Sequence, residues 1–131
     1  LNPDEQRRFL GTFEERVLGY ADIETANSLQ LQKGFLTILE NFQEKAEVLF
    51  VKISPNIEFD KQVFYIKEAK KSNSQATIVS EDHTSSPLGL VIHSNQPVQV
   101  DEKDLRLAFP NLWEVEQDEP VKKSIWKKWF G

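Results

Sequence analysis

The chain has 131 residues, a formal net charge of −5 at pH 7, and neither cysteine nor methionine. This length is typical of one domain with its own hydrophobic core, so we expect a single domain over residues 1–131. Without cysteine there can be no disulfide, thiolate metal site or thiol nucleophile. No apolar run is long enough to span a bilayer, and residues 1–8 are polar, unlike a signal peptide. We therefore expect a cytoplasmic protein, and the missing initiator methionine suggests that its natural start lies upstream.

Charge is unevenly distributed along the chain. All 21 acidic residues lie before residue 120, whereas residues 120–131 contain four lysines and no acid. An acidic body repels the phosphate backbone of nucleic acids, whose binding proteins usually carry the opposite charge balance. Nucleic acid is therefore the less favoured partner.

The first elements are a helix and a strand. Asn2 as N-cap, Pro3 and the acidic pair that follows predict a helix start, with Phe9, Leu10, Phe13 and Val17 forming its apolar face. Residues 17–23 then alternate as a strand does. Leu18 and Tyr20 are expected on one side, and Val17, Ala21 and Ile23 on the other.

Residues 31–46 have apolar side chains at intervals of three and four, which predicts an amphipathic helix. Four consecutive apolar residues at 48–51 then predict an interior strand over 48–53, buried on both faces. On that basis, replacing Phe50 by Ala would cost about 3–5 kcal/mol.

A further helix over 59–69, ended by residues 72–74, and a strand over 76–79 continue the pattern of βαβ units. The loop 81–87 is too short for a crossover helix, so a strand over 88–92 is expected to pair antiparallel with the strand before it. These elements predict an α/β (α+β) fold with a small mixed four-stranded sheet and helices on both faces.

The C-terminal third predicts two helices. The first would be capped by Asp101 and stopped by Pro110. The second, over 119–130 with Asp118 as N-cap, would be basic and aromatic. It contains two of the three tryptophans, and Lys123 and Lys127 lie opposite Val121, Ile125 and Trp129 on a helical wheel.

The sequence contains no recognisable catalytic or cofactor motif. Its five glycines are never closer than eight residues, so neither a Walker loop nor a dinucleotide-binding turn is present. His83 and His93 are expected to lie too far apart to share a metal ion, and His83 with its acidic neighbours is best interpreted as a solvated loop. The adjacent carboxylate pairs point in different directions on a helix. We therefore expect no cofactor and no metal, and nothing in the sequence argues for catalysis.

Residues 10–17, LGTFEERV, resemble the N-terminal signature of the YueI-like family of small uncharacterised bacterial proteins. A looser likeness continues through 48–53, 65–69, 77–79 and 88–91. The resemblance implies a mixed four-stranded α/β sheet and no known function.

Residues 33–37 and 48–51 are also similar in layout to the ribosomal-protein family that binds kink-turn RNA. In that family a polar RNA-contacting series follows the glycine. Here the residues after Gly34 are largely apolar, which favours shared topology and argues against shared binding.

Six residues are candidates for an interaction site. Arg16 of the family-like motif could contact an anion or a partner, with a structural ion pair to Glu14, Glu15 or an acid at a strand end as the more common alternative. The other five lie in the tail, which could bind a partner, stack on nucleic acid, lie on a membrane surface or simply dock on the body: Lys122, Lys123, Trp126, Lys127 and Trp129. The sequence thus favours a non-catalytic interaction domain that binds a protein or itself. An RNA-associated domain using Lys70, Lys71 and the tail is the alternative, and an enzyme with a small-molecule pocket stays open.

Overall fold

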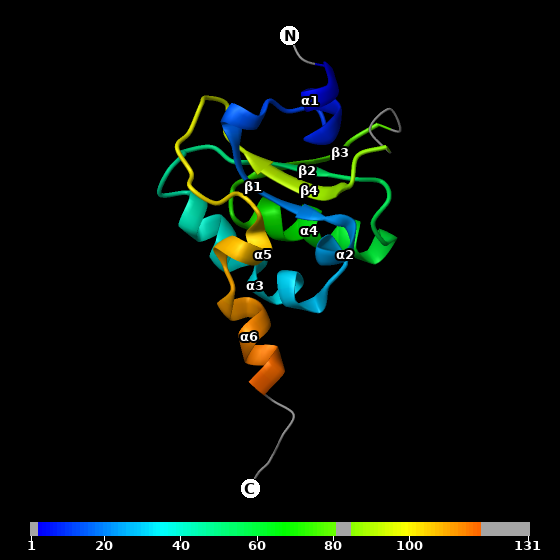
Figure 1. Cartoon of the computed structure of the whole chain (residues 1–131), viewed down its shortest axis with the longest axis vertical. Helices are drawn as coiled ribbons and strands as arrows, with labels where there is room; N and C mark the ends of the chain where they lie inside the picture. The colour runs from blue at the N-terminus through cyan, green and yellow to red at the C-terminus, as the bar shows by residue number, and fades with distance from the viewer. Residues whose placement is uncertain (1–2, 81–84, 119–131) are drawn as a thin grey trace, which may run out of the picture.

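The structure is a computed structural model that describes residues 3–80 and 85–118. Its elements, in chain order, are α1 (Pro3–Arg8), the 3-10 turn η1 (Glu14–Arg16), β1 (Val17–Asp22), α2 (Ile23–Ala26), α3 (Leu29–Phe42), β2 (Phe50–Ile53), α4 (Phe59–Lys71), β3 (Gln75–Ile78), β4 (Leu88–His93), α5 (Leu105–Ala108) and α6 (Asn111–Asp118) (Figure 1).

The four strands form one mixed sheet in the order β1-β4-β2-β3. β4 is antiparallel to both β1 and β2, and β3 is parallel to β2 through the crossover helix α4. The predicted pairing of β3 with β4 is therefore wrong, although their relative direction is right. Neighbouring strands lie only about 4.8 Å apart, so the connection between Ile78 and Leu88 is long enough to pass over β2 and place β4 beyond it.

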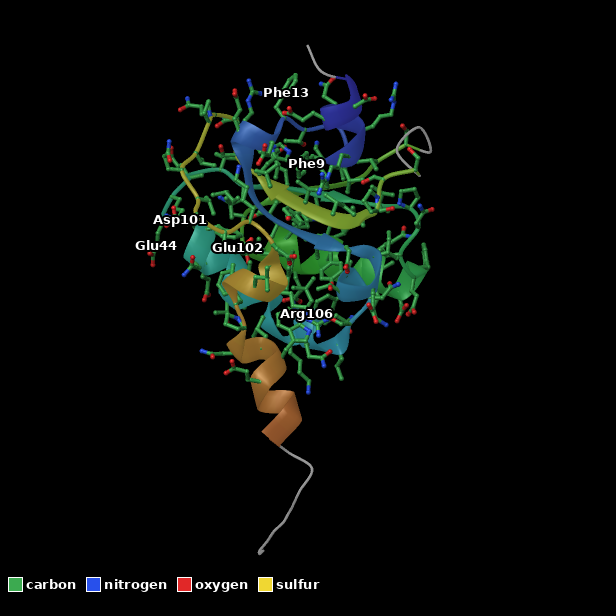
Figure 2. All side chains as sticks on the ribbon, viewed as in Figure 1. Phe9, Phe13, Glu44, Asp101, Glu102 and Arg106 are labelled. Atoms are coloured by element: carbon green, nitrogen blue, oxygen red, sulfur yellow. The ribbon has the colours of Figure 1, made fainter. Side chains whose placement is uncertain are left out.

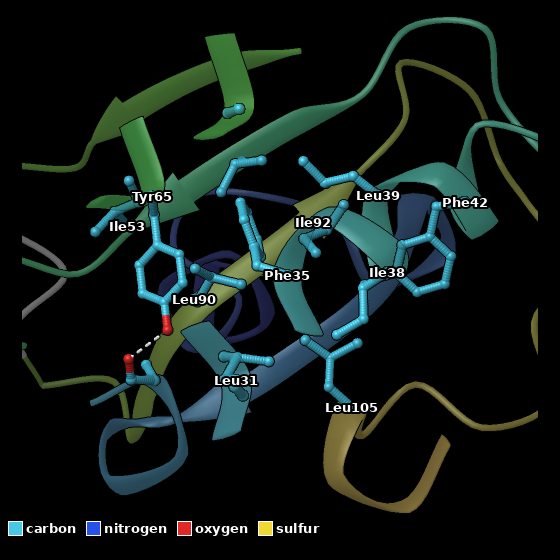
Figure 3. Close-up of a cluster of buried hydrophobic side chains, with 14 of the residues drawn as sticks. Leu31, Phe35, Ile38, Leu39, Phe42, Ile53, Tyr65, Leu90, Ile92 and Leu105 are labelled. Carbon is cyan, nitrogen blue, oxygen red and sulfur yellow. Dashed lines mark hydrogen bonds between the residues drawn. The ribbon is translucent and has the colours of Figure 1, made fainter. Parts of the chain in front are cut away.

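Helices lie on both faces of the sheet, as predicted (Figure 1). α1 lies on one side, and α2 to α5 lie on the other. The main core fills the space on the second side, where Phe35, Ile38 and Leu39 of α3 pack against Ile53 of β2 and Ile92 of β4 (Figure 3). Tyr65 of α4 crosses this core, its ring packed edge-on against Phe35, and its hydroxyl donates to the Ala26 carbonyl at 2.6 Å. Burial raises the pKa of Tyr65, so the hydroxyl stays protonated and serves as a donor.

β2 is an interior strand, as predicted, but it is fully buried on one face only. Val51 and Ile53 are buried beneath the helices, whereas Phe50 and Lys52 on the α1 side are half-buried. The short strand begins at Phe50 rather than at residue 48. The expected burial on both faces is wrong because α1 has six residues and its cluster contacts β1 and β4 rather than β2.

The predicted apolar helix face from Phe9 to Val17 is also wrong, because α1 ends at Arg8. Leu10 and Gly11 have positive φ angles of 55° and 93°. The Gly11 N–H donates to the Gln6 carbonyl at 2.6 Å, and the Leu10 N–H donates to Arg7 at 3.4 Å, which is a Schellman helix end. Phe9 and Leu10 are nevertheless buried, from the turn, in a second cluster against Val17 and Val91.

The expected alternation of β1 is interrupted by a bulge. Val17 pairs with His93 and Gly19 with Ile92, so Leu18 is the extra residue. Leu18 and Ala21 consequently face the main core, and Val17 and Tyr20 face α1, rather than the pairs expected from simple alternation.

The chain after β4 differs most from prediction. α5 is capped by Asp104, whose carboxylate accepts from the Arg106 N–H at 3.0 Å, so Asp101 is not the cap. α6 was not predicted, and Asp118 is helical as its last residue rather than an N-cap. The predicted tail helix over 119–130 lies outside the described residues.

Candidate binding site on the open sheet face

Among the described residues, the cover of the sheet on the α1 side lies over β1 and β4. Over β2 and β3 it carries Phe50, Lys52, Gln75 and Thr77, none of which is buried. His93 at the end of β4 is paired with Phe50 and is half-buried. We call the surface formed by Arg16, Phe50, Lys52 and His93 the cationic face.

Backbone pairing places Arg16 beside His93. Val17 and His93 are partners across β1 and β4, and the Ser94 N–H donates to the Arg16 carbonyl at 2.9 Å. The guanidinium of Arg16 lies over the ring of Phe13, 5.9 Å from its centroid, which is within the range of a cation–π contact. Phe13 lies on the α1 side of the sheet (Figure 2).

Phe50 and His93 form the aromatic part of the cationic face. Their ring centroids are 5.1 Å apart and their planes differ by 11°, so the two rings are stacked. Because they belong to adjacent strands in fixed register, the stack is held by the sheet itself.

The environment of His93 keeps its ring neutral. Burial is the main cause that lowers its pKa, the hydrogen bond with the Ser94 carbonyl opposes it in part, and the cationic Lys52 and Arg16 each add a smaller lowering. Nδ1 lies 2.7 Å from the Ser94 carbonyl, which can only accept, so the proton is assigned to Nδ1. In the neutral ring Nε2 is then an unprotonated acceptor.

Two polar atoms of the cationic face are buried and have no hydrogen-bond partner among the described residues. These are Arg16 Nε and His93 Nε2. Among residues 3–80 and 85–118, no carboxylate forms an ion pair with Arg16 or Lys52. The ion pair of Arg16 with Glu14 or Glu15, expected as the common alternative, is therefore not formed; Glu14 points to Lys103 instead, at 4.0 Å.

Comparison with known proteins places the chain in a family. Residues 1–104 match the family described as "Protein of unknown function (DUF1694)". The chain belongs to this family. Among solved structures, the crystal structure of the YueI protein from Bacillus subtilis is similar, with a TM-score of 0.68 and 24% sequence identity over 79% of this chain and 78% of that one. No curated protein matches.

These findings confirm the YueI-like resemblance and the fold, and they assign no activity. The DUF1694 match includes every residue of the cationic face and ends before α5. The likeness to kink-turn RNA-binding proteins stays a prediction. Gly34 has a packing reason in this DUF1694 chain, because a Cβ there would lie 2.5 Å from Leu112 Cδ1 of α6.

Of the six predicted site residues, only Arg16 is described in this DUF1694 protein. Lys122, Lys123, Trp126, Lys127 and Trp129 lie outside the described residues, as does the His83 loop. Phe50, Lys52 and His93 were missed as site residues. Alternation could have placed Phe50 and Lys52 on one face, but the position of His93 beside them depends on strand order.

Hollows lie elsewhere on the described surface, away from the cationic face. One of them, about 320 Å³, lies between α1, Tyr20 and residues 100–103. Burial and the nearby Asp104 raise the pKa of Tyr20, so its hydroxyl remains protonated. Within the described part of the chain, no three His, Asp or Glu side chains are grouped to hold a metal ion, and no helix is long and apolar enough to cross a membrane.

Proposed function

We propose that this protein is a non-catalytic cytoplasmic interaction domain that binds an acidic segment of a protein partner on the cationic face. The observation that carries the proposal is the convergence of Arg16, Lys52 and His93 without a described carboxylate to neutralise them. In a chain of net charge −5, such a local excess of positive charge attracts acidic partners by complementarity.

Phe50 and Phe13 add apolar area beside the charges. Interfaces combine aromatic anchors with arginine in this way, because both types contribute strongly to binding energy. The acidic body of a second copy is one possible source of the acidic segment. The predicted tail residues Lys122, Lys123, Trp126, Lys127 and Trp129 belong to the same proposal as an additional contact.

Affinity capture with nuclease-treated extract tests this function. We expect a protein to be retained by the wild-type chain and released as salt is raised. The variant Arg16→Gln/Lys52→Gln should lose it. Lys67→Gln, on α4 across the sheet, alters charge far from the cationic face and should retain it. Sedimentation at low and high salt identifies the case in which the partner is a second copy. Equal retention by all variants would contradict the proposal.

RNA is a second candidate because of one observation, the Phe50–His93 stack on an exposed sheet surface. Stacked rings beside cations can hold unpaired bases. Lys70 and Lys71 end α4, which leads into the end of β3 that pairs with Phe50. If the captured material disappears on nuclease treatment and its affinity falls steeply with salt, RNA replaces protein as the partner.

A further inference from the structure

We propose that Arg16, Lys52 and His93 together bind one oxyanion group of the partner, a carboxylate or a phosphorylated side chain, and that His93 takes up a proton as the group binds. The inference deepens the proposed function and rests on it for the choice of the cationic face.

The charges and geometry select an oxyanion. Arginine presents a fork of donors that matches carboxylate and phosphate, and a lysine adds a point charge. Arg16 is held against Phe13 on one side and is tied through its backbone to Ser94 on the other. Its side chain is therefore positioned before a ligand arrives, which reduces the entropy lost on binding.

The fixed orientation of the His93 ring determines which of its nitrogens takes up the proton. Nδ1 already donates to the Ser94 carbonyl, so Nε2 is the nitrogen that can gain a proton. Nε2 is buried and has no hydrogen-bond partner among the described residues, so an oxyanion reaches it only when the side chains around the ring shift as the group binds. A protonated Nε2 becomes a donor, and an oxyanion beside it can accept that hydrogen bond.

The neighbours of His93 explain why binding of the oxyanion and protonation of the ring are coupled. The charged groups acting on the ring are Lys52 from β2 and Arg16 from η1, and both oppose its protonation. The ring neighbours Phe50 and Val17 carry no charge, and Glu14 and Glu15 of η1 are exposed. An oxyanion neutralises the two cations and favours the imidazolium, so affinity should rise as pH falls.

Nuclear magnetic resonance of the ¹⁵N-labelled full chain tests the inference, with inorganic phosphate and acetate as separate probes in an oxyanion-free buffer. The His93 ring signals are assigned with His93→Gln. We expect phosphate, acetate or both to shift these signals and to raise the apparent pKa of His93. Binding should be tighter at about pH 5.5 than at about pH 8. Arg16→Gln should weaken binding about tenfold or more, and Lys67→Gln should not change it.

The two probes show which oxyanion the site prefers. If neither shifts the His93 signals, or if Arg16→Gln binds as the wild type does, the oxyanion site is refuted. Binding without a change in the pKa of His93 refutes the proton uptake. Because these measurements need no partner, an oxyanion site without protein capture would contradict the proposed function alone. Thermal unfolding of each variant confirms that it is folded.

Discussion

At Leu10 and Gly11 the backbone turns through left-handed conformations directly after α1. Leu10 is almost fully buried there, which offsets the strain of its positive φ. The turn brings the chain back toward η1 and places Arg16 at the start of β1. Leu10 and Gly11, the first two residues of the family-like motif, thus form the turn. This turn also determines the position of Arg16.

Replacing Gly11 by Ala should destabilise the fold by roughly 1–2 kcal/mol, because φ of 93° is unfavourable for any residue with a Cβ. Asn73→Gly is the matched comparison. Asn73 has a φ of 60° at the end of α4, a conformation that glycine adopts freely. Glycine there should therefore lower the free energy of unfolding by less than about 1 kcal/mol. Chemical denaturation measures both, and equal effects would argue against the left-handed turn at Gly11.

His93 should make stability depend on pH. Its pKa is lower in the folded chain than in the unfolded one, so its contribution is complete above about pH 6.5. That contribution is lost as pH falls from there toward the lowered folded value, because the unfolded chain binds the proton more readily. Between about pH 8 and pH 5, the free energy of unfolding should therefore change less with pH in His93→Gln than in the wild type, as measured by unfolding curves at each pH. An unchanged slope would contradict the buried neutral ring.

At the scale of elements, β2 separates two environments. Phe35 of α3 lies in the main core with no exposed surface, whereas Phe50 of β2 lies half-buried on the cationic face. Because Phe50 is only half-buried, its truncation removes less buried apolar area than the full burial predicted from the sequence would imply.

Phe35→Ala should cost about 3–5 kcal/mol, and Phe50→Ala should cost about 1–2 kcal/mol. The larger loss reflects the cavity that the first change leaves between helices and sheet. Phe50→Ala should also remove the stack on His93 and shift the ring signals of that histidine. A larger loss for Phe50 than for Phe35 in chemical denaturation would contradict the open face.

α6 docks on α3 through a close approach at Gly34. An added Cβ would lie 2.5 and 2.6 Å from Leu112 Cδ1 and Cδ2, closer than real contacts, so Leu112 would have to move. Trp113 beside it is buried, with Arg106 over its ring at 5.7 Å. Gly34→Val should therefore displace the start of α6 and expose Trp113. The exposure is measured as a red shift of the Trp113 fluorescence, in a chain whose other two tryptophans, Trp126 and Trp129, are replaced by Phe. An unshifted spectrum would contradict the close packing.

Element types were largely predictable because β2 and β4 are short, mainly apolar runs next to proline-containing turns, and because Ser72 to Ser74 end α4 as expected. The pairing of the strands was not predictable, because no local sequence feature indicates that β4 lies between β1 and β2. Short α5 and α6 were misread for a related reason: they are stabilised by packing on β1 and α3, and Leu105, Leu112 and Trp113 have no strong helical period of their own.

At the scale of the whole molecule, helices bury one face of the sheet, and the described residues cover the other face in part (Figure 1). The candidate site lies where the cover ends, and it combines residues from η1, β2 and β4. Sequence reasoning found Arg16 through a motif but could not bring Lys52 and His93 to it, since they are 36 and 77 positions away along the chain. That residues 1–131 form a single domain stays a prediction.

Site-specific photo-cross-linking tests the central claim, that the cationic face is the binding surface. A photoreactive residue is placed at Thr77, exposed on β3 beside Lys52, and for comparison at Lys67, exposed on α4 across the sheet. After nuclease treatment, we expect a defined protein adduct from position 77 and none from position 67, and we expect the first adduct to be lost when Arg16 and Lys52 are changed to Gln. Equal adducts from both positions, or an adduct at position 77 that survives these changes, would contradict it.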